Sequence, residues 1–276
     1  MTVRITTLSE NTAQLGFLGE WGLSILVETD STRVLLDTGL STSAVYNADL
    51  MGIDFSTIDA IVLSHAHGDH TGGLRDVLRR VRKLVQVIAH PDIWIPKYVV
   101  YGEISRYAGI PYMKEDLESL GASFTLTTKP FKISDDIMTT GEVEMTTDYE
   151  TIDDRLFVKK GNNIVPDPLT DDLAIVVKTT EGLVLITGCA HRGIINTVRH
   201  VQKLMGGEYI HTIIGGTHLM VASPERIQNT ASELKELRLQ RLGVSHCTGF
   251  NASAALAKEF SESFFLNNAG SQLTFE

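Results

Sequence analysis

The chain has few cysteines and no long hydrophobic run, and both absences narrow the class of protein. Cys189 and Cys247 are the only cysteines among 276 residues. Because they lie far apart in sequence, neither a structural disulfide nor a closed zinc site built on a cysteine pair is favoured. No apolar stretch reaches the length of about 18 residues that a membrane-spanning helix needs, and residues 1–12 lack the apolar core of a signal peptide. We therefore expect a cytoplasmic protein with no membrane partner.

Positive charge is also scarce. The chain has 24 Lys and Arg against 34 Asp and Glu, a formal net charge of −10 at pH 7. Nonspecific binding to DNA or RNA needs clustered basic side chains, so no nucleic-acid partner is expected. Hydrophobic residues at 43% and charged residues at 21% are ordinary for a globular protein. No linker interrupts the sequence, so residues 1–276 are interpreted as one domain, with which a homo-oligomer is compatible.

Residues 91–170 contain no histidine, although the whole chain has nine. They do contain several aromatic residues between polar turns, without the low complexity of a disordered linker. We interpret this segment as a folded insertion that covers a site and shapes the substrate pocket. The alternative is a helical excursion that only packs on the rest of the domain.

Histidine is instead concentrated in the stretch His65–His70, which reads His-Ala-His-Gly-Asp-His. It follows the apolar run 60–63 and precedes a helical pattern over 74–84. Unpaired imidazoles and a carboxylate are costly in a core, and a divalent metal removes that cost. Nitrogen and oxygen ligands suit Zn, with Mn or Fe as alternatives. We predict that His65 and His67 bind one ion and that Asp69 and His70, beyond the bend at Gly68, bind a second; the alternative is a surface loop.

Later strands also end at histidines. Four apolar runs, each followed by a small-residue turn and a helical pattern, lead into His65, His191, His218 and His246. Such strand-turn-helix units place the residues after each strand at one edge of a sheet. We therefore predict that these four histidines converge with His67.

These residues together resemble the metallo-β-lactamase fold superfamily. The motif His65–His70, the preceding Asp37-Thr38-Gly39 and the late histidines carry the resemblance over nearly the whole chain. It implies a layered α/β fold, a four-layer αβ/βα sandwich with two mixed β-sheets and a dinuclear metal site at the sheet edge. The segments 187–193, 215–219 and 245–249 resemble the branch named after 7,8-dihydropterin-6-ylmethyl-4-(β-D-ribofuranosyl)aminobenzene 5′-phosphate synthase.

The resemblance also implies roles for single residues. It makes His65 and His67 ligands of the first ion and Asp69, His70 and His246 ligands of the second. Asp37 would orient the motif by hydrogen bonds.

The chain departs from the common pattern at one position. Many superfamily members have a bridging aspartate where this chain has Cys189, and they have a third histidine upstream that is missing here. His191 is our candidate to complete the first site, and Asp171 or Asp172 are alternative substitutes for the missing histidine. We expect Cys189 to be an inert small residue, with a bridging thiolate as the alternative.

The implied activity is that of a dinuclear metal-dependent hydrolase. Two divalent ions share a water and present it as a bridging hydroxide, and no Gly-x-Ser-x-Gly nucleophile motif competes with this source. Asp69 would accept a proton from that water. His218 would stabilise the developing charge or protonate the leaving group, unless it is only a packed strand-end histidine.

A small anionic substrate, first of all a phosphate ester or diester, is favoured locally. A helix N-terminus near residues 71–73 would face the site. Arg192 offers a bidentate phosphate contact, and the chain near Gly216 and Thr217 offers backbone amides. Trp21 lies in a glycine-rich segment that is either an exposed loop or a flap over the substrate.

Other functions compete with hydrolysis. They are the transfer reaction of the synthase branch and a non-catalytic role in metal binding or ligand sensing. A flavodiiron redox role is disfavoured, because that branch has a glutamate at the position of His67 and an attached flavin domain.

Overall fold

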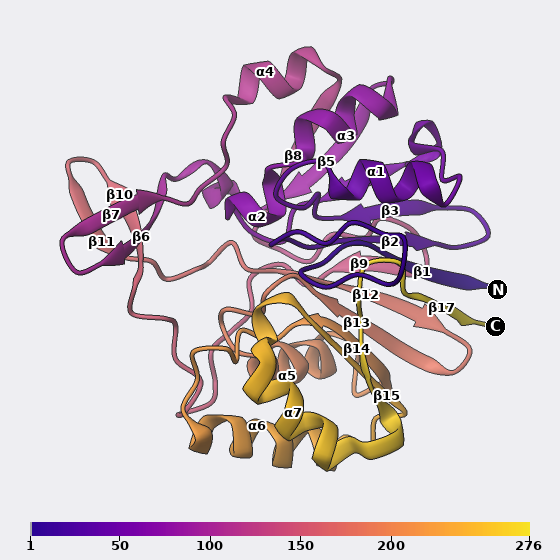
Figure 1. Cartoon of the computed structure of the whole chain (residues 1–276), viewed down its shortest axis with the longest axis vertical. Helices are drawn as coiled ribbons and strands as arrows, with labels where there is room; N and C mark the ends of the chain where they lie inside the picture. The colour runs from indigo at the N-terminus through magenta and orange to yellow at the C-terminus, as the bar shows by residue number, and fades with distance from the viewer. Residues whose placement is uncertain (1) are drawn as a thin grey trace.

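The computed structural model describes residues 2–276, and its two larger β-sheets pack face to face with helices on both outer faces (Figure 1). The first sheet contains, in spatial order, β17 (Gln272–Phe275), β1 (Val3–Ser9), β2 (Ser24–Glu28), β3 (Arg33–Leu36), β4 (Ala60–Val62), β5 (Val85–Ala89) and β8 (Ala122–Leu126). The second contains β16 (Phe264–Leu266), β15 (Arg241–Ser245), β14 (Ile210–Gly216), β13 (Gly182–Thr187), β12 (Ala174–Thr179) and β9 (Ile137–Thr139). Both sheets mix parallel and antiparallel pairs, so the predicted four-layer sandwich is confirmed.

The helices form the two outer layers. Figure 1 shows α1 (Ser43–Leu50), α3 (Leu74–Val81) and α4 (Lys114–Ser119) on one side, and α5 (Ile194–Leu204), α6 (Pro224–Glu236) and α7 (Gly249–Phe260) on the other. The helix expected over 74–84 ends at Val81 because Arg82 adopts a left-handed conformation with φ of 54° and the chain then enters β5. Among residues 2–276, no helix is both long and apolar enough to span a bilayer.

The hydrophobic core explains why the strand sequences are nearly continuous apolar runs. In β3, Leu35 packs under the helices while Val34 and Leu36 face the other sheet. In β13, Leu185 likewise faces α5 while Val184 and Ile186 lie between the sheets. A strand that is buried on both faces needs an apolar residue at every position. Because both faces of these strands are buried, the strands are held firmly, and so are the polar residues that follow their ends.

Residues 91–170 divide between a separate sheet and the sandwich. A four-stranded sheet, here called the arm, contains β11 (Asn163–Pro166), β10 (Leu156–Lys160), β6 (Lys97–Tyr101) and β7 (Ile104–Tyr107). It projects from the sandwich in Figure 1. The rest of the segment supplies β8 to the first sheet and β9 to the second. The segment is therefore part of the sandwich as well as an addition to it.

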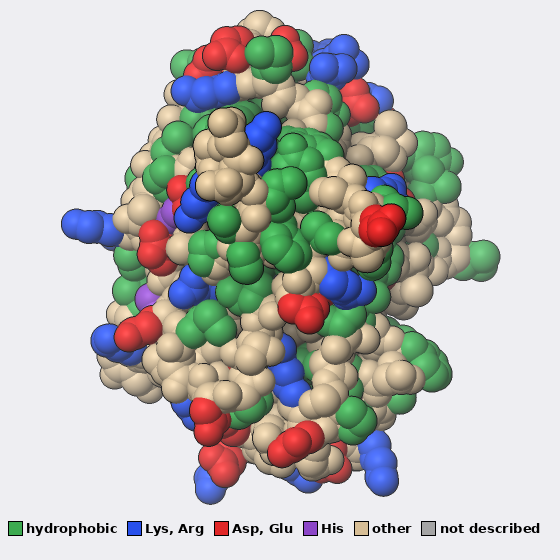
Figure 2. Space-filling model, turned by 90° about the vertical axis from the view of Figure 1, so that its left-hand side faces the viewer, with side chains coloured by type: hydrophobic (Ala, Val, Ile, Leu, Met, Phe, Trp, Pro, Cys, Tyr) green, Lys and Arg blue, Asp and Glu red, His purple; other side chains and the backbone are tan. Residues whose placement is uncertain are grey.

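The surface of this side combines apolar and charged groups. On the arm, Tyr101, Ile104, Tyr107 and Ile164 are all about half exposed or more. Figure 2 faces the side of the molecule from which the arm projects and shows hydrophobic side chains across its centre, with Lys, Arg, Asp and Glu interspersed.

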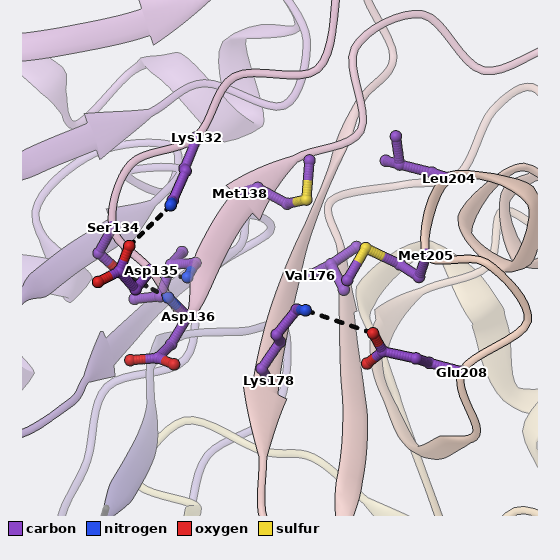
Figure 3. A pocket seen from close by; sticks show the side chains of 11 residues that line it. Lys132, Ser134, Asp135, Asp136, Met138, Val176, Lys178, Leu204, Met205 and Glu208 are labelled. Atoms are coloured by element: carbon purple, nitrogen blue, oxygen red, sulfur yellow. Dashed lines mark hydrogen bonds and ion pairs between the residues drawn. The ribbon is translucent and has the colours of Figure 1, made fainter.

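Figure 3 shows a pocket in another part of the molecule, where β9, β12 and the end of α5 meet. Ion pairs such as Lys178 with Glu208 (3.3 Å) lie in its lining. That lining contains no histidine.

Candidate metal centre

The ends of β4, β13, β14 and β15 bring the predicted histidines together. The Nε2 atoms of His65 and His191 lie 3.2 Å apart, and those of His70 and His246 also lie 3.2 Å apart. The rings of His65 and His67 are 4.6 Å apart, and those of His191 and His218 are 4.1 Å apart. The convergence predicted from the strand ends is therefore present, although the strand ends are separated in the sequence. The group is called the histidine cluster and contains His65, His67, His70, His191, His218 and His246.

The backbone at these strand ends is strained. Eight non-glycine residues of the described chain have a positive φ, and four of them lie at this site: Asp37, Ala190, His218 and His246. Such conformations cost free energy and cluster at functional sites, where the surrounding packing holds them. Their presence here indicates that the placement of the side chains, rather than the preferred backbone conformation of these residues, determines the local structure.

Asp37 sets the orientation of two imidazoles. Its carboxylate accepts hydrogen bonds from the Ser64 backbone N–H (2.7 Å), the Ser64 hydroxyl (2.7 Å) and His70 Nδ1 (2.7 Å). Because the Ser64 hydroxyl donates to Asp37, it accepts from His65 Nδ1 at 2.8 Å. Both histidines therefore carry a proton on Nδ1 and direct Nε2 toward the cluster. Asp37 is fully buried, as expected of a residue that orients ligands.

Burial keeps one half of the cluster neutral. It lowers the pKa of His67 to about 4 and the pKa values of His65 and His191 well below the ordinary value. These imidazoles therefore present lone pairs at neutral pH. For His70, burial alone would lower the pKa, but the Asp37 and Asp69 carboxylates raise it to about 9 in the protein without metal.

Asp69 lies on the other side of the cluster with Trp21. The Asp69 carboxylate accepts from the Trp21 indole N–H (3.0 Å) and lies 3.2 Å from His246 Nε2. Burial would raise the pKa of Asp69, but His70 and His246 hold it well below its usual range. Trp21 is 46% exposed and its ring lies 5.0 Å from that of His246. It therefore forms part of the rim of the site.

The second sheet adds a pair of thiols and a further ion pair. Cys189 Sγ lies 3.1 Å from His70 Nε2, and both cysteines are free and buried. Cys247 Sγ accepts the His218 backbone N–H at 3.2 Å. His218 Nε2 lies 3.7 Å from the Asp153 carboxylate. Burial alone would lower the pKa of His218, but Asp153 and Cys247 raise it to about 9.

Several supporting residues were not predicted from the sequence. Glu10 accepts the His246 backbone N–H (2.6 Å), and Asn11 Oδ1 lies 2.8 Å from His246 Nδ1. Neither these residues nor Asp153 lie in a motif or near a histidine in sequence, so no local signal could have identified them. Glu10 and Asn11 reach His246 because the chain after β1 packs beside the end of β15, and Asp153 reaches His218 from the loop that precedes β10.

A buried ion-pair cluster connects the arm to the histidine motif. Lys97 Nζ lies 2.7 Å from Asp171 and 2.9 Å from Asp167, and all three side chains are at most 1% exposed. The second oxygen of Asp171 accepts the Ala66 backbone N–H at 2.9 Å. Both carboxylate oxygens of Asp171 are therefore occupied, and the side chain lies behind the motif rather than among the histidines. This differs from the alternative in which Asp171 substitutes for the missing histidine ligand. Asp172 accepts the Arg192 backbone N–H at 3.0 Å, and its Oδ1 is buried without a partner.

The expected anion contacts from the second sheet differ from the structure. The Gly216 N–H donates to the Gly188 carbonyl (3.1 Å), and the Thr217 hydroxyl is buried and donates to Thr248 (3.0 Å). The Gly216 amide and the Thr217 hydroxyl are therefore not free for a substrate, because each already pairs with a neighbouring residue at the tip of β14. The Arg192 guanidinium donates to the Pro168 carbonyl at 2.8 Å, so it would have to change partner to bind a phosphate.

The cluster fits divalent metal ions by its donors. His67 Nε2 is buried with no hydrogen-bond partner, which is costly for a polar atom unless a ligand completes it. Among residues 2–276 there are three groups in which the possible ligand atoms lie within 4.8 Å of one another: His65, Cys189 and His191; His70, Cys189 and His246; Cys189, His218 and Cys247. Imidazole and thiolate donors suit Zn and related ions.

Replacing Asp37 with asparagine is expected to weaken the binding of the ion held by His70 by about 10–100-fold. An amide NH₂ facing His70 Nδ1 would force that nitrogen to accept, which places the proton on Nε2 and removes its lone pair. Titration against a chromophoric chelator measures the affinity. Asp76→Asn, at an exposed position on α3, is the control, and an affinity equal to that of the wild type in the Asp37 variant would contradict the assigned orientation.

Comparison with known proteins agrees with the fold and the motif. A family model described as the metallo-beta-lactamase superfamily matches residues 22–201. The chain is 33% identical to the 7,8-dihydropterin-6-methyl-4-(beta-D-ribofuranosyl)-aminobenzene-5′-phosphate synthase of Methanocaldococcus jannaschii, over 99% of this chain and 97% of the relative. A crystal structure described as a metal-dependent hydrolase of the beta-lactamase superfamily is 31% identical, covers 98% of both chains and superposes with a TM-score of 0.85. A metallo-beta-lactamase fold protein of Bacillus subtilis, 14% identical over 99% of both chains with a TM-score of 0.60, shares the fold. The chain therefore belongs to the metallo-beta-lactamase superfamily.

Proposed function

We propose that this protein is a metal-dependent enzyme that hydrolyses a phosphate ester or diester of a small anionic molecule, using two divalent ions, with Zn preferred. The observation that carries the proposal is the pairing of buried imidazoles at 3.2 Å, His65 with His191 and His70 with His246. The ring of His67, whose Nε2 has no partner, lies 4.6 Å from that of His65 and 4.8 Å from that of His191. His65, His67 and His191 would hold one ion. Asp69, His70 and His246 would hold the other.

The protein's own residues would then position and protonate the reactants. Bound divalent ions supply Lewis acidity, which lowers the pKa of water and polarises a phosphoryl group. Asp69 is ionised and lies at the rim beside Trp21, where it can orient the attacking water and accept its proton. His218 is held in its protonated form by Asp153 and would donate a proton to the leaving oxygen. The arm would cover the substrate, because the Ala108 carbonyl at its base accepts the N–H of Gly68 in the motif at 2.8 Å.

A transfer reaction is the second candidate, and the relative named as a synthase favours it because the similarity extends over nearly both whole chains. The name of that relative contains a 5′-phosphate, so both candidates place a phosphate ester in the substrate. In the transfer reaction, an amine or carbon nucleophile would replace water. Water would have to be excluded from the pocket, and the aromatic residues of the arm are suited to that purpose.

The two candidates are separated by their products. We expect zinc-reconstituted protein to release p-nitrophenol from bis-p-nitrophenyl phosphate, to lose this activity on chelation and to recover it with added Zn. A parallel incubation with a pterin pyrophosphate and a ribofuranosylaminobenzene phosphate, followed by mass spectrometry, tests for the condensed product. Protein that holds two ions and forms neither product would overturn the proposal in favour of a metal-binding or ligand-sensing role.

A further inference from the structure

Cys189 Sγ lies where the two halves of the histidine cluster meet. Among the described residues, it is the one donor that belongs both to the set with His65 and His191 and to the set with His70 and His246. Its distance to His70 Nε2 is 3.1 Å, and the side chain is 3% exposed. We propose that Cys189 binds as a thiolate shared by both ions, and this inference rests on the two-ion site of the proposed function.

The chain around Cys189 is shaped to bring it there. A Cβ at Gly188 would lie 2.1 Å from the Ser64 hydroxyl, so only glycine lets the end of β13 pack directly against the residue that precedes His65. Ala190 follows with φ of 52°, which turns the backbone between Cys189 and His191. Both side chains consequently enter the cluster from one short turn.

The other cysteine is excluded from the shared position by its contacts. Cys247 Sγ accepts the His218 backbone N–H (3.2 Å) and lies 3.5 Å from the Cys189 carbonyl oxygen. It belongs only to the set with Cys189 and His218, not to either set with a histidine of the first sheet. The chain thus offers a matched pair of buried thiols, one between the two imidazole pairs and one behind them.

A shared thiolate has a consequence for metal choice. Sulfur is a soft ligand that favours Zn and disfavours Mg and Mn, which prefer carboxylate oxygens. Four or five imidazoles alone would accept several transition metals. Cys189 would therefore narrow the range of ions that the site holds tightly.

The test is the absorption spectrum of the cobalt-loaded protein without substrate. Wild type, Cys189→Ser and Cys247→Ser are loaded with up to two equivalents of Co²⁺ under anaerobic conditions. We expect a thiolate-to-cobalt charge-transfer band in the near ultraviolet for wild type and Cys247→Ser, and its loss in Cys189→Ser. Because serine differs from cysteine by one atom, the variant preserves the packing; circular dichroism checks its fold, and Cys189→Asp, which also lacks sulfur but keeps an acidic donor, repeats the measurement.

Retention of the band in Cys189→Ser, its loss in Cys247→Ser alone, or its absence from wild type with two bound cobalt ions would overturn the proposal. Failure of this inference and failure of the proposed function give different results. A wild-type protein with the band but without hydrolysis or transfer contradicts only the function. A protein that turns over a phosphate ester but lacks the band contradicts only the role of Cys189.

Discussion

Replacing His67 with alanine is expected to abolish phosphate ester hydrolysis and to reduce the metal content from two ions per chain toward one. His67 Nε2 is buried without a protein partner, and burial keeps the ring neutral with a pKa of about 4. The nitrogen is therefore available only to a ligand. Loss of a residue that merely orients a ligand costs about 10–100-fold, so loss of a direct ligand is expected to reduce kcat/KM by more than about 100-fold. Atomic absorption and a steady-state assay on the same sample measure both effects.

His211→Gln is the matched control for this substitution. Like His67, His211 is buried, but it lies in the second sheet at the start of β14 and pairs with Glu181 at 3.2 Å. The control is expected to keep both ions and full activity. Wild-type activity with two ions in His67→Ala would show that the histidine cluster is not the catalytic centre.

Replacing Lys97 with methionine is expected to lower the free energy of unfolding by about 3–5 kcal/mol, the cost of leaving a buried charge without its partner. Among residues 2–276, Lys97 is the only cation that forms an ion pair with Asp167 and Asp171. Methionine keeps most of the side-chain volume but removes this charge. Two carboxylates would then face each other in a site that excludes water. Because Asp171 also accepts the Ala66 N–H, the histidine motif would lose a support, and metal binding is expected to weaken. Urea unfolding followed by circular dichroism measures the change.

Lys178→Met provides the comparison for an exposed ion pair. Lys178 and Glu208 are both close to half exposed and lie 3.3 Å apart, so the expected loss is at most about 1 kcal/mol. Equal stability losses in the two variants would mean that the Lys97 cluster contributes no more than a surface pair. An unchanged metal affinity in Lys97→Met would separate the arm from the site.

The parts of the fold and site that were predictable from the sequence are those with local signals. The apolar runs of β2, β3 and β13 end at turns that contain polar or small residues. The motif His65–His70 indicates metal binding by its composition alone. The convergence of His191, His218 and His246 followed from a rule about strand ends, because parallel strands place their carboxyl ends at one edge. The layered fold followed from the same pattern together with the resemblance.

The parts that were not predictable depend on contacts between residues far apart in sequence. Lys97 reads as an ordinary surface charge at the start of a strand, and nothing near it in sequence indicates the two aspartates, which lie 70 and 74 positions later. Asp153 lies in a stretch with no clear periodicity, yet it pairs with His218. The division of residues 91–170 between the arm, β8 and β9 is a property of sheet pairing, which short-range patterns do not record. The sequence also does not show that the Gly188 carbonyl lies opposite the Gly216 amide and accepts its N–H.

The site is assembled from two halves that meet only when the layers dock. His65, His67 and His70 come from the first sheet, whereas His191, His218 and His246 come from the second, and neither half alone contains the imidazole pairs at 3.2 Å. Bound ions would consequently crosslink the two sheets where they pack against each other. By mass action, an ion present at 100 times its dissociation constant adds about 2.7 kcal/mol to the folded state. Metal binding and the packing of the two layers are therefore thermodynamically coupled. A substitution between the layers would change the metal affinity without contacting a ligand.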